Sequence, residues 1–161
     1  MNIRKSQEAD LDKILQIYAN AREQMRESGN PSQWGEGWPP ESLIREDIKA
    51  GNGYVVEKDG RVCGVFAFLL GTDPTYMKIE SGSWKNEEPY GTIHRLAGDG
   101  SQKGVFRACL EYCLRKIPNV RMDTHGDNLI MQHLLEKNGC EKCGIIYVHD
   151  GTPRIAYQKS L

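Results

Sequence analysis

A glycine-rich turn that runs into an amphipathic segment is the first place in this sequence where residue types suggest chemistry. The stretch is GDGSQKGVFRACLEYC, residues 98–113, and it contains Gly98, Gly100 and Gly104. Free backbone amides at the start of a helix attract a phosphate, and the helix dipole adds to that attraction. The same glycines would also serve a tight strand-to-helix connection that binds nothing. The spacing of the glycines matches neither the P-loop nor the dinucleotide-binding pattern. The neighbouring sequence must therefore decide between a phosphate site and a simple connection.

The cysteines suggest a second kind of site. Cys140 and Cys143 have the C-x-x-C spacing of half a zinc site or of a redox pair, and His125, His133 or His149 would supply nitrogen ligands. No second pair lies at zinc-finger spacing, and Cys140 follows a predicted helix end rather than a strand-to-helix turn. The chain has five cysteines, an odd number, so free thiols are expected.

Composition excludes several classes of protein. The chain has 161 residues, of which 39% are hydrophobic and 27% charged, and its net charge is −1. These values suit one globular domain over residues 1–161 that buries roughly 70% of its unfolded surface. Acids and bases are interspersed, so no nucleic-acid partner is expected. No segment has the length and apolar character of a membrane span or signal peptide, so no membrane partner and a cytoplasmic location are expected.

Periodicity predicts the elements that position these residues. A short strand precedes a long amphipathic helix with Ser6 as its N-cap. The Gly- and Pro-rich loop SGNPSQWGEGWPP follows, and Pro40-Glu41 opens a second helix. Asp59-Gly60 between two β-rich runs predicts an antiparallel hairpin.

After a polar insert over residues 71–89, predicted strands and helices continue to alternate in the second half of the chain. YGTIHRLAG is predicted to be a strand, residues 103–116 a helix, and NVRMDTH a strand. DNLIMQHLLEKNG is predicted to be a helix capped by Asp127 or Asn128, and two final strands flank His149-Asp150-Gly151. The order is strand, helix, helix, three strands, helix, strand, helix, two strands.

This order resembles that of the GCN5-related N-acetyltransferases over essentially the whole chain, and two local patterns support the resemblance. In that family a bulged strand leads to a Gln/Arg-x-x-Gly-x-Gly/Ala loop that holds the pyrophosphate of acetyl-CoA. The aligned residues here are Ser101-Gln102-Lys103-Gly104-Val105-Phe106, and only Gly104 keeps its residue type. The second pattern, Asn128-x-x-Met131-x-x-Leu134-Leu135, is similar to the family's Asn-x-x-Ala-x-x-Leu-Tyr. The resemblance implies one α+β domain with a mixed, mostly antiparallel central sheet flanked by helices on both faces.

The resemblance also implies a site for acetyl-CoA as co-substrate, with no metal. Asn128 would contact the pantetheine arm, and Asp99 would place a negative charge near the pyrophosphate that Lys103 could compensate. Leu135 stands where the family often has the tyrosine that protonates the departing thiolate, and Tyr147, Tyr157 or a water would replace it. The implied coenzyme contacts are Leu96, Ala97, Gly98, Ser101, Gln102, Lys103, Gly104, Val105, Phe106, Asn128 and Met131.

Acetyl transfer to a primary amine needs a proton acceptor, because such an amine is mostly ammonium at neutral pH. His94 is the first candidate, with a structural role as an equal alternative. Its neighbour Arg95 should face the opposite side of the strand. Glu80 and His125 are further candidates for the base. The resemblance implies that the backbone amide of Leu96 or Ala97 would stabilise the oxyanion.

The resemblance also implies that the tryptophan-bearing loop and the polar insert form the acceptor pocket, because the corresponding segments shape it in that family. Candidate substrate contacts are Trp34, Trp38, Glu80, Trp84 and His125. Acids in these segments favour a cationic amine of a small molecule or peptide, acetylated by direct transfer in a ternary complex. Two alternatives are a non-catalytic acyl-CoA-binding module and an interaction protein without a coenzyme site. A homodimer is left open.

Overall fold

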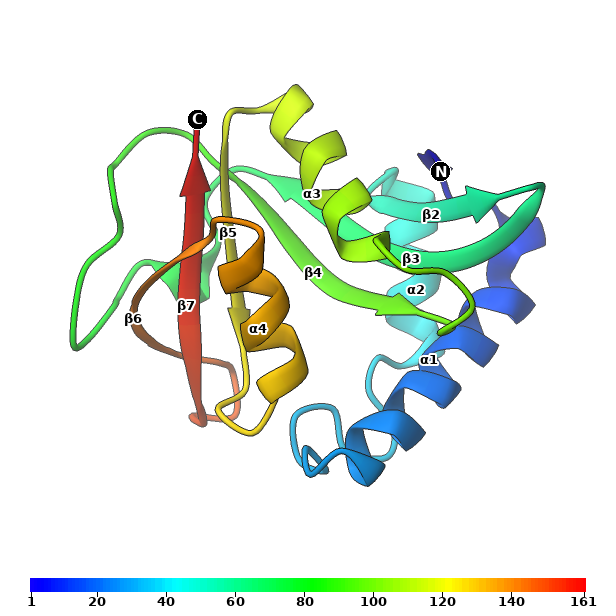
Figure 1. The fold of residues 1–161 in the computed structure, drawn as a ribbon, viewed down its shortest axis with the longest axis horizontal. Coiled ribbons are helices and arrows are strands. Elements are labelled where there is room, and N and C mark those ends of the chain that lie inside the picture. The colour runs from blue at the N-terminus through cyan, green and yellow to red at the C-terminus, as the bar shows by residue number, and fades with distance from the viewer.

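Seven strands form one mixed sheet at the centre of the molecule, and the computed structural model describes residues 1–161 (Figure 1). The order across the sheet is β1-β2-β3-β4-β5-β7-β6. Neighbouring strands are antiparallel except β4 and β5, which are parallel. The strands are β1 (Asn2–Lys5), β2 (Gly53–Lys58), β3 (Arg61–Leu70), β4 (Gly91–Gly98), β5 (Asn119–Thr124), β6 (Glu141–Tyr147) and β7 (Pro153–Ser160).

Helices cover both faces of this sheet. On one face α1 (Leu11–Glu27) and α2 (Glu41–Ala50) pack on β2, β3 and β4. On the other face lie α3 (Val105–Lys116) and α4 (Leu129–Lys137), which are drawn in front of the sheet in Figure 1. Short 3-10 helices occupy Glu8–Asp10 and Pro74–Tyr76. The predicted element order and fold class are confirmed.

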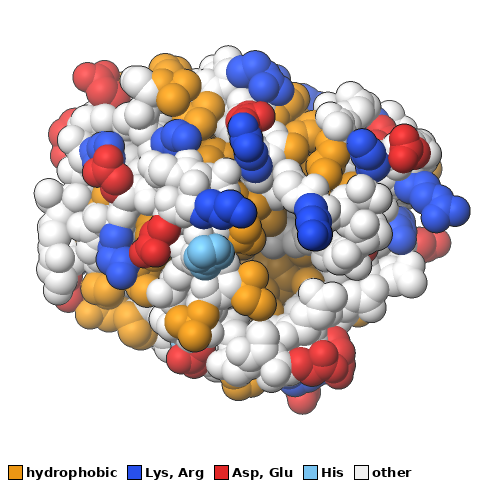
Figure 2. Space-filling view, in the orientation of Figure 1, with side chains coloured by type: hydrophobic (Ala, Val, Ile, Leu, Met, Phe, Trp, Pro, Cys, Tyr) orange, Lys and Arg blue, Asp and Glu red, His pale blue; other side chains and the backbone are white.

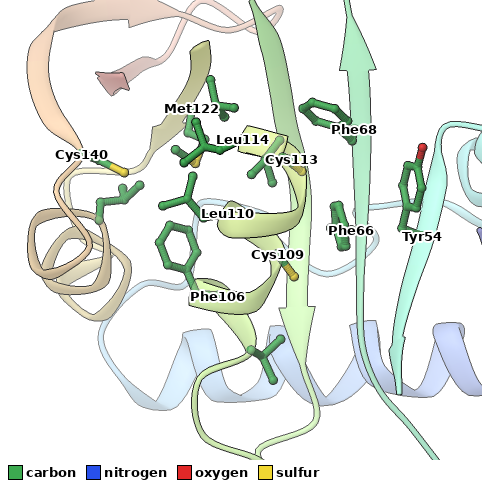
Figure 3. Close-up of a cluster of buried hydrophobic side chains, with 14 of the residues drawn as sticks. Tyr54, Phe66, Phe68, Phe106, Cys109, Leu110, Cys113, Leu114, Met122 and Cys140 are labelled. Carbon is green, nitrogen blue, oxygen red and sulfur yellow. The ribbon is translucent and has the colours of Figure 1, made fainter. Parts of the chain in front are cut away.

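Apolar spacing explains why α3 forms and where it packs. Phe106, Cys109, Leu110 and Cys113 recur on one side of the helix and are buried against the sheet, as Figure 3 shows. Burying each of the larger side chains contributes roughly 1.5 to 3 kcal/mol. The largest core cluster therefore lies between α3, α4 and the sheet, and it fixes the position of the turn that precedes α3.

Three local predictions can be compared with the structure. The Asp59-Gly60 hairpin is confirmed, and both residues have positive φ. Asn128 caps α4, since its side chain accepts a hydrogen bond from the Met131 amide. Ser6 as the cap of the first long helix is wrong. Its N–H still donates to the Gly53 carbonyl as part of the strand pairing, and the helical turn begins only after Gln7.

Strands β4 and β5 separate soon after they begin, as Figure 1 shows. They pair only at Gly91 with Val120 and at Thr92 with Arg121. Beyond these pairs β4 remains bonded to β3, and β5 remains bonded to β7. The sheet is therefore open at its centre.

A bulge in β4 lies beside this opening. Val65 pairs with Ala97 and Ala67 pairs with His94, so two residues of β4 lie opposite Phe66 of β3. One of the two, Arg95, has a φ of 54°. The bulge breaks the alternation of side chains, and the prediction that Arg95 faces away from His94 is wrong. His94 pairs with Ala67, which is on the same face of β3 as Val65 of the α1 and α2 core cluster, and Arg95 bonds to Asp47 of α2, so both face these helices.

None of the helices combines the length and the apolar composition that a membrane span requires.

Candidate active site

A cavity of about 600 Å³ lies where β4 and β5 separate. Phe106, Met122 and Leu135 line it on the side of α3 and α4, where they belong to the largest core cluster. Trp34 and Leu43 line it on the side of α1 and α2. The cavity thus passes through the plane of the sheet. Figure 2 shows a hollow on the α3 and α4 face, with apolar side chains in its floor and Lys and Arg side chains around its rim.

His94 and Asp73 form a hydrogen-bonded pair in this cavity. The His94 Nε2 to Asp73 Oδ2 distance is 2.8 Å, and Asp73 also accepts from the amide and hydroxyl of Thr75 at 2.9 and 2.7 Å. Burial acts to raise the pKa of Asp73, but the hydrogen bonds from His94 and Thr75 outweigh it and hold that pKa at about 2. Asp73 is therefore ionised and can only accept hydrogen bonds.

This pairing fixes the tautomer of the histidine. Because an ionised Asp73 accepts from Nε2, the hydrogen of the neutral ring is on Nε2, and Nδ1 is left with a lone pair. No group of the chain hydrogen-bonds to Nδ1. His94 can thus accept a proton from a molecule in the cavity, and the imidazolium that forms is stabilised by Asp73.

A second carboxylate, Asp123 of β5, also lines the cavity. It accepts a hydrogen bond from the Tyr76 hydroxyl at 2.6 Å, and the Tyr76 ring centroid lies 6.2 Å from that of His94. Burial raises the pKa of Asp123, in the opposite direction to the shift at Asp73. Two carboxylates near one histidine therefore have different proton affinities, a pattern typical of acid and base sites.

The bulge residue Arg95 is anchored to the helices behind it. Its Nη2 lies 2.9 Å from both carboxylate oxygens of Asp47 in α2. Its carbonyl accepts a hydrogen bond from the Tyr18 hydroxyl of α1 at 2.7 Å. Because a trans peptide holds C=O and N–H on opposite sides, the N–H of Leu96 points away from α1. The bulge thus fixes the direction of one backbone donor at the cavity wall.

The turn between β4 and α3 presents unpaired backbone amides. No acceptor within the chain bonds to the N–H groups of residues 102–107. Gly104, the N-cap of α3, has a φ of 81° and no side-chain cap. The Asp99 carboxylate bonds instead to the amide and hydroxyl of Ser101, at 2.8 and 2.5 Å, and lies 4.0 Å from Lys13. This turn is an exposed donor array suited to an anion.

Helix α4 forms the opposite wall. The Asn128 side chain caps the helix through Met131 and donates to Gln33 Oε1 at 2.9 Å, which ties α4 to the tryptophan-bearing loop. Leu135 lines the cavity and is otherwise buried. Phe106, in the position where the resembled family has a small residue, lies on the side of α3 that faces α4 (Figure 3).

The structure brings only part of the predicted site to the cavity. Residues 101–104 lie in the exposed turn, Gly98 is partly buried at its start, and Ala97 and Val105 are buried in the core. The predicted residues that line the cavity are His94, Leu96, Phe106, Asn128, Met131, Trp34 and Trp38.

Other predicted residues lie outside the cavity lining. Tyr147 is 43% exposed, and its hydroxyl donates to Glu80 Oε2 at 3.1 Å, so both side chains are engaged outside the cavity. Trp84 donates to the Tyr76 carbonyl and packs in a small core cluster. His125 accepts from the Asp127 amide and lies near a serine hydroxyl, outside the cavity lining.

Tyr157, the other candidate replacement for the family tyrosine, is fully buried in the core and does not reach the cavity. Cys140 packs in the same core cluster, and the Cys143 thiol donates to the Glu141 carbonyl. No group of His, Cys, Asp or Glu side chains suited to a metal ion forms around either cysteine. All five cysteines are free thiols and buried, and none lines the cavity.

Sequence reasoning missed Asp73, Asp123 and Arg154, all of which line the cavity. One signal was available in the β5 sequence NVRMDT: Asn119, Arg121 and Asp123 alternate with apolar residues. This places three polar groups on one face of a strand buried at the centre of a sheet. Such a face needs polar partners, and here the insert between β3 and β4 supplies them.

Solved structures of acetyltransferases are similar to this chain over almost its whole length. A GNAT-family acetyltransferase from Streptococcus agalactiae 2603 is 30% identical with a TM-score of 0.90, covering 99% of this chain and 95% of that one. A GNAT-family acetyltransferase from Listeria monocytogenes 4b F2365 is 17% identical with a TM-score of 0.72, covering 99% and 94%. The aminoglycoside acetyltransferase AAC(6')-Ib, solved with ribostamycin and coenzyme A, is 20% identical with a TM-score of 0.67, covering 99% and 92%.

The fold is therefore that of an acetyltransferase domain. No family model and no curated protein sequence matches this chain, so the assignment rests on the solved structures. The 30% identity with the streptococcal acetyltransferase extends over nearly all of both chains. This chain belongs to the GNAT family of acetyltransferases, and acetyl transfer is the reaction class that this membership assigns.

Proposed function

We propose that this protein is an acetyl-CoA-dependent N-acetyltransferase that transfers the acetyl group directly to a primary amine in a ternary complex. The observation that carries the proposal is the cavity that passes through the sheet, with the His94–Asp73 pair inside it. Such a cavity admits one substrate from each face, so that their reactive ends meet between β4 and β5. No cysteine lines it, which favours direct transfer over an acetyl-cysteine intermediate.

The coenzyme enters from the side of α3 and α4 in this proposal. Its pyrophosphate is held by the unpaired amides of residues 102–107, with Lys103 adding a positive charge. Its pantetheine arm lies in the gap beside β4, where Phe106, Met131 and Leu135 provide an apolar wall. Asn128 contributes mainly by holding this wall in place, because its side chain already caps α4 and bonds to Gln33.

The chemical step uses groups on both sides of the gap. The free amine attacks the thioester carbon, His94 Nδ1 accepts the proton that the nitrogen loses, and Asp73 stabilises the imidazolium. The Leu96 N–H, directed by the bulge, stabilises the oxyanion, and one such donor is typically worth roughly 3 kcal/mol of barrier. When the C–S bond breaks, the proton passes from His94 to the coenzyme thiolate. The products are the acetamide and free coenzyme A.

The residue at position 135 affects which group can protonate the departing coenzyme thiolate, because the side chain of Leu135 has no proton to donate. It lines the cavity where the resembled family often has a tyrosine, and neither Tyr147 nor Tyr157 replaces that group. A thiolate is a good leaving group because thiols ionise near pH 8.5, so His94 suffices as the shuttle in this proposal. The same leucine favours a second candidate function, a coenzyme-binding module without turnover.

Thermal unfolding with acetyl-CoA, with ATP as a control, tests the coenzyme site. Ligand at a hundred times its dissociation constant stabilises the fold by about 2.7 kcal/mol, a shift in Tm of about 5 to 10 °C at this chain length. A panel of amines assayed for coenzyme A release then separates the two functions. A shift without turnover on any amine would favour the binding module. No shift, supported by calorimetry, would overturn both.

A further inference from the structure

Arg154 is a buried cation in the wall of the cavity. It stands near the start of β7, is 7% exposed, and lines the cavity. Its guanidinium donates to the Thr152 hydroxyl and the Pro153 carbonyl at 2.9 Å, and to the Gln33 carbonyl at 3.4 Å. All three acceptors are uncharged, and no carboxylate lies within 4.0 Å of this guanidinium. Buried charges are normally paired, so this positive charge lacks its usual partner.

The positive charges of two other arginines at the sheet, Arg95 and Arg121, are compensated by contacts that Arg154 lacks. Arg95 is paired with Asp47. Arg121 lies between the rings of Trp84 and Tyr90, with its guanidinium carbon 4.2 and 4.0 Å from their centroids, outside the cavity. Only Arg154 faces the cavity with neither a carboxylate nor an aromatic ring in contact.

Arg154 lies on the acceptor side of the reaction centre. Asp123 pairs with Ala156 in the β5–β7 register, so Arg154 is two residues along β7 and on the same face of the sheet as Asp123. Diagonal neighbours of this kind are about 7 to 8 Å apart. His94 faces the cavity from the other side of the gap. Asp123 is influenced by the charges of both His94 and Arg154, so a molecule whose amine lies near His94 can extend past Asp123 towards Arg154.

Two carboxylates, Asp123 and Asp150, attract Arg154 from a distance, but neither contacts it. Asp123 is engaged by Tyr76, and Asp150 accepts from the amide and hydroxyl of Thr152. His149 of the β6–β7 turn lines the cavity and is exposed. The ring of Trp34 supplies an apolar surface at the same end.

We infer that Arg154 binds a carboxylate of the acceptor, and that the acceptor is an amino acid, an amine with a carboxylate a few bonds away. This inference rests on the proposed function, because it assigns the substrate class of the same site. Guanidinium and carboxylate form two parallel hydrogen bonds, which add specificity for a planar anion. The carboxylate would supply the charge that Arg154 lacks, while the ionised Asp73 beside His94 attracts the ammonium group.

Matched acceptors provide the test. We would compare L-phenylalanine with L-phenylalaninamide, and L-leucine with L-leucinamide, by following coenzyme A release. The amide of each pair has the larger fraction of free amine near neutral pH, because a neutral carboxamide stabilises the ammonium less than a carboxylate does. A preference for the acid therefore reports carboxylate binding and not amine basicity. We expect kcat/KM to be at least tenfold higher for the acids.

Variants assign that preference to Arg154. Arg154→Gln should remove it, Arg154→Lys should retain part of it, and Arg61→Gln, which removes an exposed arginine at the β2–β3 hairpin, should leave it unchanged. Calorimetry with N-acetyl-L-phenylalanine and its amide, in the presence of coenzyme A, measures the same preference without turnover. If Arg154→Gln does not fold, Arg154→Lys and the two ligands on the wild-type protein decide the question.

The outcomes separate this inference from the proposed function. Turnover with equal kcat/KM for acid and amide would overturn the carboxylate site and leave acetyl transfer standing. Tighter binding of the acetylated acid, lost in Arg154→Gln, without turnover of any amine, would overturn the catalytic proposal and support the carboxylate site. Equal binding of the two acetylated ligands without turnover would overturn both.

Discussion

The anion site at the start of α3 can be tested with a pair of variants that differ in charge alone. Gly104 is exposed, has a φ of 81°, and a Cβ added there meets no atom within 4 Å. Asp and Asn both tolerate this left-handed conformation and have nearly the same shape. Gly104→Asp therefore places a negative charge beside the amides of residues 102–107, and Gly104→Asn is its matched control.

The expected effect follows from Coulomb's law. Two unit charges 5 Å apart in a medium close to water interact by about 0.8 kcal/mol, and a pyrophosphate has about two such charges. Gly104→Asp should thus bind acetyl-CoA more weakly than Gly104→Asn by about 1.6 kcal/mol, or roughly 15-fold in Kd, and the difference should shrink in high salt.

Isothermal calorimetry at low and high ionic strength measures this difference, and thermal unfolding without ligand checks that both variants fold. Equal Kd values for the two variants at low salt would refute the placement of the pyrophosphate at α3. A loss of binding in both variants to the same extent would show that the side chain blocks the turn by size, and would equally contradict the electrostatic reasoning.

Three further predictions concern the catalytic pair and the stability of the fold. His94→Gln and Asp73→Asn should each lower kcat about 100-fold or more and leave the Kd for acetyl-CoA within about twofold, and an unchanged kcat in either variant would exclude the pair as the base. The pKa of Asp73 in the fold, about 2, lies below its ordinary value of 3.8, so its contribution is present above pH 4 and is lost as the pH falls towards 2. Acid titration of urea unfolding should show the wild type losing about 2 kcal/mol more than Asp73→Asn across that range, and parallel curves would contradict the shift. Arg121→Ala removes a guanidinium held between two aromatic rings and should lower the free energy of unfolding by about 3 kcal/mol, a fall in Tm of roughly 6 to 12 °C, whereas Arg61→Ala at an exposed hairpin should not change it.

The fold could be predicted from local signals because each of its elements has one. The Asp59-Gly60 turn lies between two apolar runs, and the apolar spacing of α3 defines both the helix and its buried side. The N-cap prediction was wrong by one residue, because Gln7 rather than Ser6 precedes the 3-10 turn Glu8–Asp10 that runs into α1. Ser6 has the preferred residue type, but its backbone is committed to a strand partner 47 positions away in the chain, at Gly53.

The candidate site was less accessible because its contacts join distant segments. His94 could be found from its position before the glycine-rich turn, but its partner Asp73 lies in a polar insert with no pattern of its own. The β4 bulge places Arg95 on the side of the strand opposite to the one expected, and no residue type in this strand indicates that a bulge is present. The sequence does not single out Arg154, because the observation that supports its role is the absence of a carboxylate in contact with its guanidinium. That absence can be recognised only when the positions of all its neighbours are known.

The separation of β4 and β5 has a mechanical consequence. The sheet consists of two halves that share only the backbone pairings at Gly91 with Val120 and Thr92 with Arg121. Main-chain amides that face the gap have no strand across from them, so hydrogen exchange should be faster there than in the interior of either half. A coenzyme arm in the gap would join the halves, and the protein would be stiffest when loaded. Each release of coenzyme A would then loosen the sheet, which couples turnover to the rigidity of the whole domain.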